Sequence, residues 1–152
     1  MKISTKGRYG LRAMLDLAKH CQSGETVCVQ SISRRQNISE SYLEQLVRLL
    51  RKADLITSVR GAGGGYQLAK DPIDISVGDI LRACEGDIEV VSCGSKDDSG
   101  CDQATRCVTK IVWDSVNNAI EDAVNSISLQ QLIDESNALD RQDQLDTTQC
   151  IN

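Results

Sequence analysis

The run Gly61-Ala62-Gly63-Gly64-Gly65 restricts the fold of this chain more than any other feature. It separates two short segments, residues 55–60 and 66–68, whose side chains favour β-strands. Glycine reaches positive φ at little cost, so the run predicts the turn of a β-hairpin. A nucleotide-phosphate loop is disfavoured, because no helix N-terminus follows the glycines and the Lys-Ser/Thr pair of a P-loop is missing.

Three helices are predicted before the hairpin. In residues 6–20, apolar side chains recur at i, i+3, i+4 and i+7, at Leu11, Met14, Leu15 and Ala18. Arg8 and Arg12 lie on a different face of this helix, free to meet phosphates or acidic groups. Residues 29–35 form a short second helix. A third helix runs to about Ala53, and both Ser39 and Ser41 can cap it, the latter in a capping box with Glu44.

Two short helices joined by a tight turn are typical of a helix-turn-helix, whose second helix enters the major groove of DNA. Taken alone, the third helix is equally an amphipathic helix with a solvated face. A hairpin directly after it favours a winged helix, in which Arg60 reaches a minor groove and the glycines approach a phosphate. The predicted DNA-contacting residues are Ser39, Ser41, Tyr42, Glu44, Gln45, Arg48, Arg60, Gly61, Gly63 and Gly64.

Charge divides the chain into two halves. Residues 1–70 hold 12 Lys and Arg against 5 Asp and Glu, whereas residues 71–152 hold 5 against 17, which together give the net charge of −5. This asymmetry predicts a basic contact surface followed by an acidic body. No apolar run approaches the roughly 20 residues that span a bilayer, and the N-terminus lacks a signal-peptide block. We therefore expect a cytoplasmic protein with reduced thiols and no membrane partner.

The second half begins with a break at Asp71-Pro72. Ser76 is predicted to cap a helix over residues 77–85, with Asp79 at the capping-box position and Gly86 as its stop. Cys84 lies on the apolar side of that helix and is expected in the core. Two further cysteines, Cys21 and Cys28, are expected to be small buried or half-buried thiols.

A long helix is predicted over residues 108–126. Its apolar residues form one continuous stripe that is too long for a small domain to bury, so a two-fold partner helix is the economical solution. Ser128 is expected to cap a short last helix, residues 129–133. The polar, aperiodic sequence from residue 136 to 152, which includes Cys150, is expected to be a disordered tail.

Three cysteines, Cys93, Cys101 and Cys107, lie within fifteen polar, Gly- and Asp-rich residues. Soft thiolates select zinc, copper(I) or iron–sulfur clusters, although C-x7-C-x5-C is not the spacing of a zinc ribbon. Three ligands leave a fourth position to fill. The dipole of the long helix favours a thiolate at Cys107. Three unliganded surface thiols are the alternative, and their liability to oxidation counts against it.

Residues 4–9, 41–46 and 59–66, together with the three-cysteine loop, resemble a family of winged-helix repressors that respond to iron–sulfur clusters. The family includes regulators of cysteine metabolism and sensors of nitric oxide. The resemblance covers about residues 1–135. It implies a homodimer that binds double-stranded promoter DNA and carries a 2Fe–2S cluster on each subunit at Cys93, Cys101 and Cys107. It also implies repression of cluster-assembly genes, including the protein's own operon.

The chain departs from this family at the fourth ligand. Cluster-sensing members place a His three residues after the third Cys, where this sequence has Lys110, and its one histidine, His20, lies in the first helix. Nitric-oxide sensors take a carboxylate from the partner's first helix, where this sequence has Arg8, so that route looks closed. The remaining candidates are a residue of the partner chain, an external thiol, Asp102, Asp114 or Cys150.

The sequence therefore predicts a mainly α protein with a small β wing. A winged helix-turn-helix domain (1–86) precedes a cysteine-rich cluster-binding loop (87–107), a dimerisation helix with a short terminal helix (108–135) and the tail (136–152). No base–nucleophile pair indicates an enzyme, and no small-molecule substrate is expected. The predicted function is a cluster-sensing DNA-binding repressor. The alternative is a regulator of cysteine metabolism, or a nitric-oxide or redox sensor, acting through a partner protein or a different signal.

Overall fold

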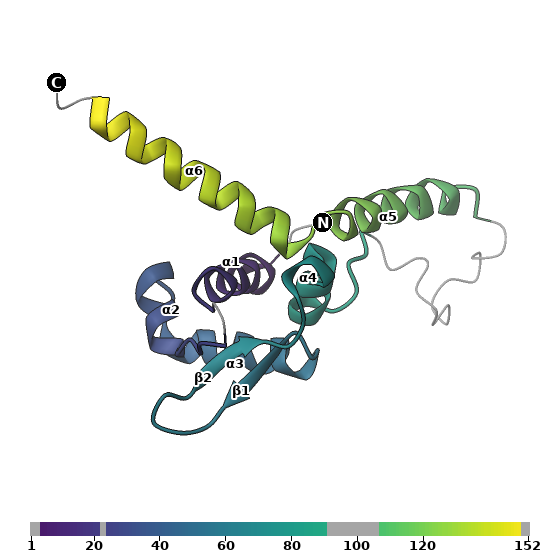
Figure 1. Ribbon diagram of the computed structural model, residues 1–152. Coiled ribbons are helices and arrows are strands. Elements are labelled where there is room, and N and C mark those ends of the chain that lie inside the picture. The colour runs from purple at the N-terminus through teal and green to yellow at the C-terminus, as the bar shows by residue number, and fades with distance from the viewer. Residues whose placement is uncertain (1–3, 22–23, 91–106, 150–152) are drawn as a thin grey trace.

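The computed structural model describes residues 4–21, 24–90 and 107–149, apart from the side chains of residues 143–149. In this part of the chain, helices pack into a body with a small antiparallel hairpin at its edge, and two further helices leave the body in different directions (Figure 1). The elements are α1 (Thr5–His20), α2 (Val29–Gln36), α3 (Glu40–Lys52), β1 (Ile56–Val59), β2 (Gly65–Leu68), the 3-10 turn η1 (Pro72–Asp74), α4 (Val77–Glu85), α5 (Lys110–Asn125) and α6 (Leu129–Gln149). The predicted fold class, mainly α with a small β wing, is confirmed.

The turn between α2 and α3 is set by two residues. Asn37 takes the left-handed conformation (φ 52°, ψ 49°) and ends α2, after which Ser39 is extended and occupies the N-cap of α3. The predicted capping box of Ser41 and Glu44 is wrong. Because α3 begins at Glu40, Ser41 is already inside the helix and its hydroxyl is not at the cap position.

The hairpin pairs Ile56 with Leu68 and Val59 with Gly65, as expected for a short wing. Val27 joins its edge, since its amide and carbonyl each bond to Tyr66 at 2.9 Å. Glycine is required at two positions of the loop. Gly61 has φ +124°, and a Cβ at Gly64 would lie 2.6 Å from the carbonyl oxygen of Val59.

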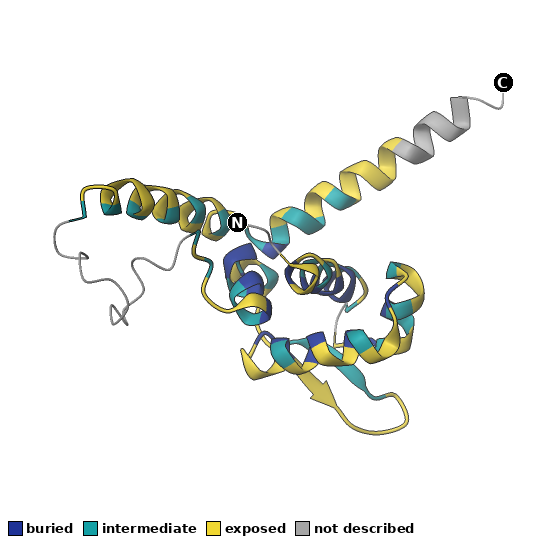
Figure 2. Cartoon of the chain, turned by 180° about the vertical axis from the view of Figure 1, so that it is seen from behind, coloured by how far each residue is buried: buried dark blue, intermediate teal, exposed yellow. Residues whose placement is uncertain are grey.

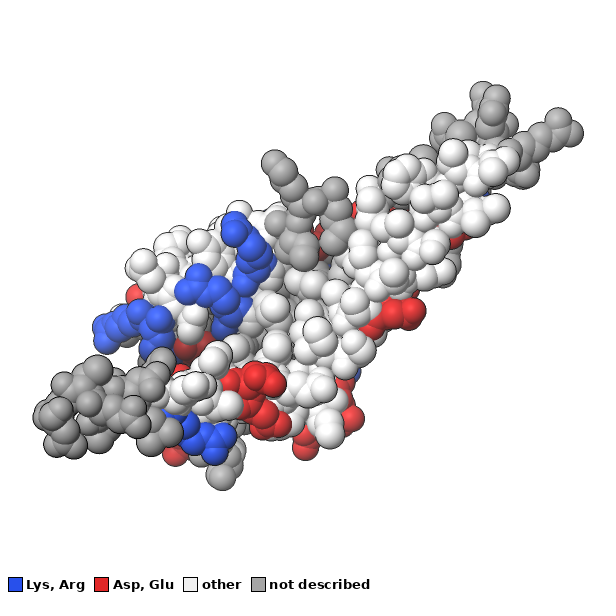
Figure 3. Space-filling model, turned by 90° about the horizontal axis from the view of Figure 1, so that it is seen from above, with Lys and Arg blue, Asp and Glu red and all other residues white. Residues whose placement is uncertain are grey.

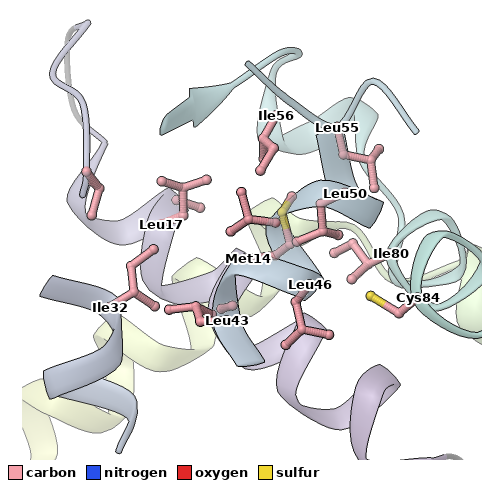
Figure 4. Packing of buried hydrophobic residues seen from close by; sticks show 14 of the residues in the cluster. Met14, Leu17, Ile32, Leu43, Leu46, Leu50, Leu55, Ile56, Ile80 and Cys84 are labelled. Atoms are coloured by element: carbon pink, nitrogen blue, oxygen red, sulfur yellow. The ribbon is translucent and has the colours of Figure 1, made fainter. Parts of the chain in front are cut away.

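The core lies where α1, α2, α3, α4 and the base of the hairpin meet (Figure 4). The predicted stripes of α3 and α4 are buried, whereas in α1 Met14 and Ala18 are buried as predicted, Leu11 and Leu15 are half-buried, and Ala13 and Leu17 are buried in addition. The buried side chains at its centre are those of Met14, Leu17, Ile32, Leu43, Leu46, Leu50, Leu55, Ile56, Ile80 and Cys84. Their burial supplies the main hydrophobic stabilisation of the winged helix.

Helix α4 is capped as its sequence predicted. The Ser76 hydroxyl accepts from the Asp79 amide at 3.0 Å, and the Asp79 carboxylate accepts from the Ser76 amide at 3.0 Å. Cys84 is buried against Gly10 of α1, where a Cβ would collide with its sulfur. Burial raises the pKa of the Cys84 thiol to about 11, so it stays protonated at neutral pH.

Of the two other described cysteines in the first half, Cys21 is half-buried as expected. Cys28 is exposed, so the expectation of a buried or half-buried thiol is wrong there. The reason is that Cys28 occupies the N-cap of α2, a position that faces solvent, and its sulfur lies 3.0 Å from the Ser31 hydroxyl.

The tail prediction is also wrong, because residues 136–149 continue α6 as a helix. Leu129 is fully buried. The first turn is capped because the Ser128 amide donates to the Gln131 side-chain oxygen and the Gln131 amide donates to the Ser128 hydroxyl. Lys19 of α1 then holds the helix further along, at Ser136 and Asp140, both at 2.7 Å. With no glycine or proline after Leu129, nothing in the sequence stops the helix. Cys150 lies outside the described residues.

Helix α5 confirms the predicted long helix, with bounds two residues shorter at the start. None of its residues is fully buried, and Figure 2 shows exposed and half-buried residues alternating along it. Ile111 is 72% and Val112 55% exposed, whereas Ile120 and Val124 are half-buried toward the body. The predicted apolar stripe therefore has one side turned to its own chain and one side turned outward.

Candidate nucleic-acid interface

Helix α3 presents a polar face next to the hairpin. Its buried face is anchored in the core by Leu43, Leu46, Val47 and Leu50, which leaves the opposite side to solvent. The predicted DNA-contacting residues on that exposed side are Ser39, Ser41, Glu44, Gln45 and Arg48. The amphipathic pattern of the sequence thus places these five side chains where a groove of DNA can reach them.

Tyr42 differs from the other predicted contacts. It is half-buried, and its ring meets that of Tyr9 edge to face, with centroids 6.0 Å apart. Burial raises the pKa of its phenol, so the hydroxyl remains a hydrogen-bond donor. The Tyr42 ring packs against the core and against Tyr9. Tyr42 therefore connects α3 to α1.

The wing is tethered to the segment before α2. The Thr26 hydroxyl donates to the Gly63 carbonyl at 2.5 Å, and Gly65 lies so close to Val27 that a Cβ would be 2.7 Å from its carbonyl oxygen. Arg60, Gly61 and Gly63 are exposed, whereas Gly64 is half-buried. The chain therefore holds the wing loop beside the helix-turn-helix while leaving Arg60 accessible.

An open hollow lies between α3 and the wing. It is lined by Val29, Glu44, Val47, Arg48, Arg51 and Tyr66. Two arginines and one carboxylate thus share a concave surface with the wing strand. Such a surface attracts phosphate through its arginines, while Glu44 opposes it locally and favours donor groups of bases.

Charge follows the division found in the sequence. In Figure 3, Lys and Arg side chains gather toward the left of the molecule, whereas Asp and Glu lie mostly in the middle and along the arm toward the right. This face lies away from α3 and the wing, which are at the bottom of Figure 1, so the arginines of the candidate interface are on the opposite side.

Sequence reasoning missed a buried ion pair between α1 and α2. Asp16 is 3% exposed, and its carboxylate accepts from Arg35 at 2.6 Å and from the Gln36 side chain at 2.8 Å. The bond to Asp16 raises the pKa of Arg35. Arg12, expected to be free for phosphates, donates instead to the Gln36 carbonyl at 2.8 Å. Residues so distant in sequence carry no periodic signal that could have revealed these contacts.

The cysteine cluster is only partly within the described residues. Cys93 and Cys101 lie outside them, as does Asp102. Cys107 is half-buried and precedes α5, with its sulfur 3.0 Å from the Thr109 hydroxyl, and this contact lowers the pKa of the thiol. Lys110, the first residue of α5, pairs with Asp114 at 3.1 Å. A deprotonated thiol at Cys107 is the form that a metal or cluster binds.

Other described residues offer no second metal centre. In the part of the chain that the structure covers, no three His, Cys, Asp or Glu side chains gather closely enough to hold a metal ion. His20, at the end of α1, lies 2.8 Å from the carbonyl oxygen of Asp16. Among the same described residues, no helix has the length and apolarity needed to cross a membrane.

The helix-turn-helix, the tethered wing and the polar face of α3 together define a winged-helix transcriptional regulator. The sequence pattern of the Rrf2 family, described as iron-dependent transcriptional regulators, matches residues 3–135, and the chain belongs to that family. The family resemblance inferred from the sequence is confirmed.

Relatives named IscR and CymR are both similar to this chain. The HTH-type transcriptional regulator IscR of Vibrio vulnificus is 41% identical over all of this chain and 89% of that protein. The structure of T. potens IscR is 43% identical, with TM-score 0.70 over 90% of this chain and 88% of that one. The structure of CymR, the global cysteine regulator of B. subtilis, is 41% identical, with TM-score 0.71 over 89% and 98%.

Proposed function

We propose that this protein is a dimeric repressor that reads paired DNA half-sites with α3 and the wing. The observation that carries this proposal is the hollow in which Arg48, Arg51 and Glu44 of α3 face Tyr66 of the wing. Arginine supplies both phosphate contacts and bidentate base contacts. Ser41 and Gln45, exposed on the same helix, add short polar groups suited to base edges.

A second copy of the chain is the proposed cover for α5. Ile111, Val112 and Val116 are large apolar residues exposed on one helix, where water contact is unfavourable. Two-fold pairing of α5 would bury them and place two α3 helices on one DNA duplex. Dimers of helix-turn-helix proteins read half-sites about one helical turn, or a multiple of it, apart.

Cys93, Cys101 and Cys107 are proposed to hold a 2Fe–2S cluster. Support comes from the donor set, since thiolates are the usual ligands of such clusters, and from the lowered pKa of Cys107. When bound, the cluster supplies a redox- and oxygen-sensitive group whose presence depends on the supply of iron and sulfide. Lys110 carries an ammonium group where cluster-sensing relatives have His, and a protonated amine has no lone pair for iron, so another group supplies the fourth ligand.

Cluster occupancy is proposed to change which DNA sites the protein binds. Glu44 is the residue best placed to report such a change, because a carboxylate is repelled by phosphate and by bases that present acceptors. A small movement of α3 would move the Glu44 carboxylate from a position where phosphate repels it to one where it accepts a hydrogen bond from a base. The resemblance of the sequence to cluster-responsive repressors supports cluster-assembly genes, including the protein's own operon, as the targets.

The decisive experiment measures cluster content and DNA binding on the same anaerobic preparation. Visible absorption, iron and sulfide would be determined for the unaltered protein and for Cys93→Ala, Cys101→Ala and Cys107→Ala. We expect the unaltered protein to absorb visible light, and we expect each of the three substitutions to abolish that absorption. Cys28→Ala serves as the matched control, because it removes an exposed thiol from α2. DNA footprints of the apo and loaded forms should differ on at least one promoter, and identical footprints on every promoter tried would refute switching.

The similarity to CymR favours a second candidate function, a regulator of cysteine metabolism that works through a partner protein. It predicts colourless protein even after anaerobic reconstitution with iron and sulfide. It also predicts that DNA affinity changes when a cysteine-biosynthetic enzyme is added and not when iron is supplied. The absorption measurement therefore separates the two candidates.

A further inference from the structure

Helix α4 holds the end of α5 through one side-chain contact. The Arg82 guanidinium donates to the Asn125 side-chain oxygen at 2.8 Å and, through the same nitrogen, to Asp79 at 3.0 Å. Gly78 makes room for this arrangement, because a Cβ there would collide with the Asn125 oxygen and lie 3.1 Å from the Arg82 nitrogens. The absence of a side chain at position 78 thus lets Asn125 lie directly on α4.

Few other contacts determine the direction of α5. None of its residues is fully buried, and only the side that carries the half-buried Ile120 and Val124 packs on the body. Its C-terminal end is anchored where the Val77 amide donates to the Ile127 carbonyl at 2.8 Å. Beyond that anchor, Asn125 accepts from Arg82, and Asn117 accepts from the Val90 amide at 2.9 Å.

Helix α4 is in turn fixed to the DNA-reading body. The Glu85 carboxylate accepts from the Ser4 hydroxyl at 2.7 Å and from the Gly7 amide at 2.8 Å, at the start of α1. One residue earlier in α4, Cys84 fills the space left by Gly10 of α1. Because α4 moves with α1, a contact that fixes α5 to α4 also fixes α5 relative to α3 and the wing.

We propose that the Arg82–Asn125 contact, seated on Gly78, sets the spacing of DNA half-sites that the dimer accepts. This inference rests on the proposed function, since it takes α5 as the dimerisation helix. Helix α5 is about 24 Å long, so a tilt of about 5° at its anchored end moves the other end by about 2 Å. One base pair shifts a half-site by about 3.4 Å and rotates it by about 35°. A tilt of about 8° would therefore match the translation of one base pair, and the rotation of the half-site adds to the misfit that a wrong spacer imposes.

The test compares Asn125→Ala with Asn125→Asp, which keeps an oxygen acceptor for Arg82. Asn118→Ala is the matched control, because it removes the same side chain from an exposed position of α5. Full operators obtained by selection on the unaltered protein would be prepared with the native spacer and with one base pair added or removed. Affinities would be measured by fluorescence anisotropy, and dimerisation by analytical ultracentrifugation.

Asn125→Ala should remain a dimer and lose at least about fivefold of its preference for the native spacer, the factor that corresponds to the net contribution of one typical hydrogen bond. Asn125→Asp and Asn118→Ala should keep that preference. Gly78→Ala should weaken the spacer preference as Asn125→Ala does, because the added methyl group displaces the Asn125 side chain. If Asn125→Ala fails to fold, the Gly78→Ala variant provides the test.

An unchanged spacer preference in a folded, dimeric Asn125→Ala or Gly78→Ala protein would overturn the proposal. A monomeric Asn125→Ala protein would overturn it too, since the contact would then determine assembly and not angle. Failure of the proposed function looks different, because the unaltered protein would then be monomeric or show no spacer preference.

Discussion

The guanidinium of Arg35 lies against the buried carboxylate of Asp16, with Nη2 2.6 Å from Oδ1. Nineteen residues separate the two in sequence, and their contact ties the first helix of the helix-turn-helix to α1. Asp16 is nearly inaccessible, whereas the Arg35 side chain keeps about a third of its surface in water. The two partners are therefore unequal, and their removal should have unequal consequences.

Replacing Arg35 with Met should destabilise the protein by about 2–4 kcal/mol, because it leaves a buried carboxylate without its cation. Chemical denaturation followed by circular dichroism would measure the change. The double substitution Asp16→Leu with Arg35→Met should recover much of the loss, since no buried charge remains. Arg34→Met, on the exposed side of α2, is the control. A double variant less stable than Arg35→Met alone would contradict this account.

Replacing Arg60 with Ala should weaken DNA binding by about 1–3 kcal/mol if the side chain reads a base, and by less if it contacts only phosphate. Anisotropy titrations over a series of salt concentrations would distinguish these cases, because a lost phosphate contact lowers the salt slope by about one. Arg141→Ala removes the same charge from α6 and should leave affinity unchanged. If the affinity of the unaltered protein for DNA did not depend on salt concentration, the assignment of a basic DNA interface would be wrong.

Placing a charge on the outward side of α5 should separate the subunits. Val116→Asp puts a carboxylate among exposed apolar side chains, and we expect monomers in sedimentation experiments. Affinity for paired half-sites should then fall about 100-fold or more, because the second half-site is no longer held at high effective concentration. Asn118→Asp adds the same charge at a position that is already polar. Monomeric unaltered protein would refute the dimer directly.

The described thiols should differ in their reaction with iodoacetamide as pH rises. The side-chain hydrogen bond with Ser31 lowers the pKa of Cys28, so it carries more thiolate at a given pH than an ordinary cysteine. Burial raises the pKa of Cys84 to about 11 and shields it from the reagent. Peptide mapping of apo protein alkylated between pH 6 and pH 9, roughly the range of ordinary thiol titration, should show Cys28 modified at lower pH than Cys84. Modification of Cys84 before Cys28 would argue against the packing of α4 on α1.

Replacing Ser31 with Ala tests the origin of the Cys28 behaviour. Without the hydroxyl, the thiolate loses its main stabilising contact, so alkylation of Cys28 should require higher pH. Ser33→Ala, in the same helix, is the matched control, because its hydroxyl bonds to the Ile38 carbonyl. If Cys28 were alkylated at equal rates in Ser31→Ala and in the unaltered protein, the lowered pKa of Cys28 would have another cause than Ser31.

The sequence by itself determined the elements whose signals are local. Helical spacing located α1, α3 and α4, the Ser76–Asp79 box placed the start of α4, and the glycine run located the wing between residues 59 and 65. Such signals are readable because side-chain periodicity and capping depend on neighbours within one or two turns. The polar face of α3 followed from the same pattern, since burial of its apolar stripe leaves only one side for DNA.

Tertiary structure alone decided how these elements meet. The Asp16–Arg35 pair, the cap that Glu85 provides for α1, and the contact of Asn125 with Arg82 join residues far apart in the chain. The helix from 136 to 149 also escaped prediction, because Lys19 and the buried Leu129 anchor a segment whose own sequence is nearly all polar. Contacts between distant residues depend on the packed geometry of both partners, and no periodicity in one segment encodes the position of the other.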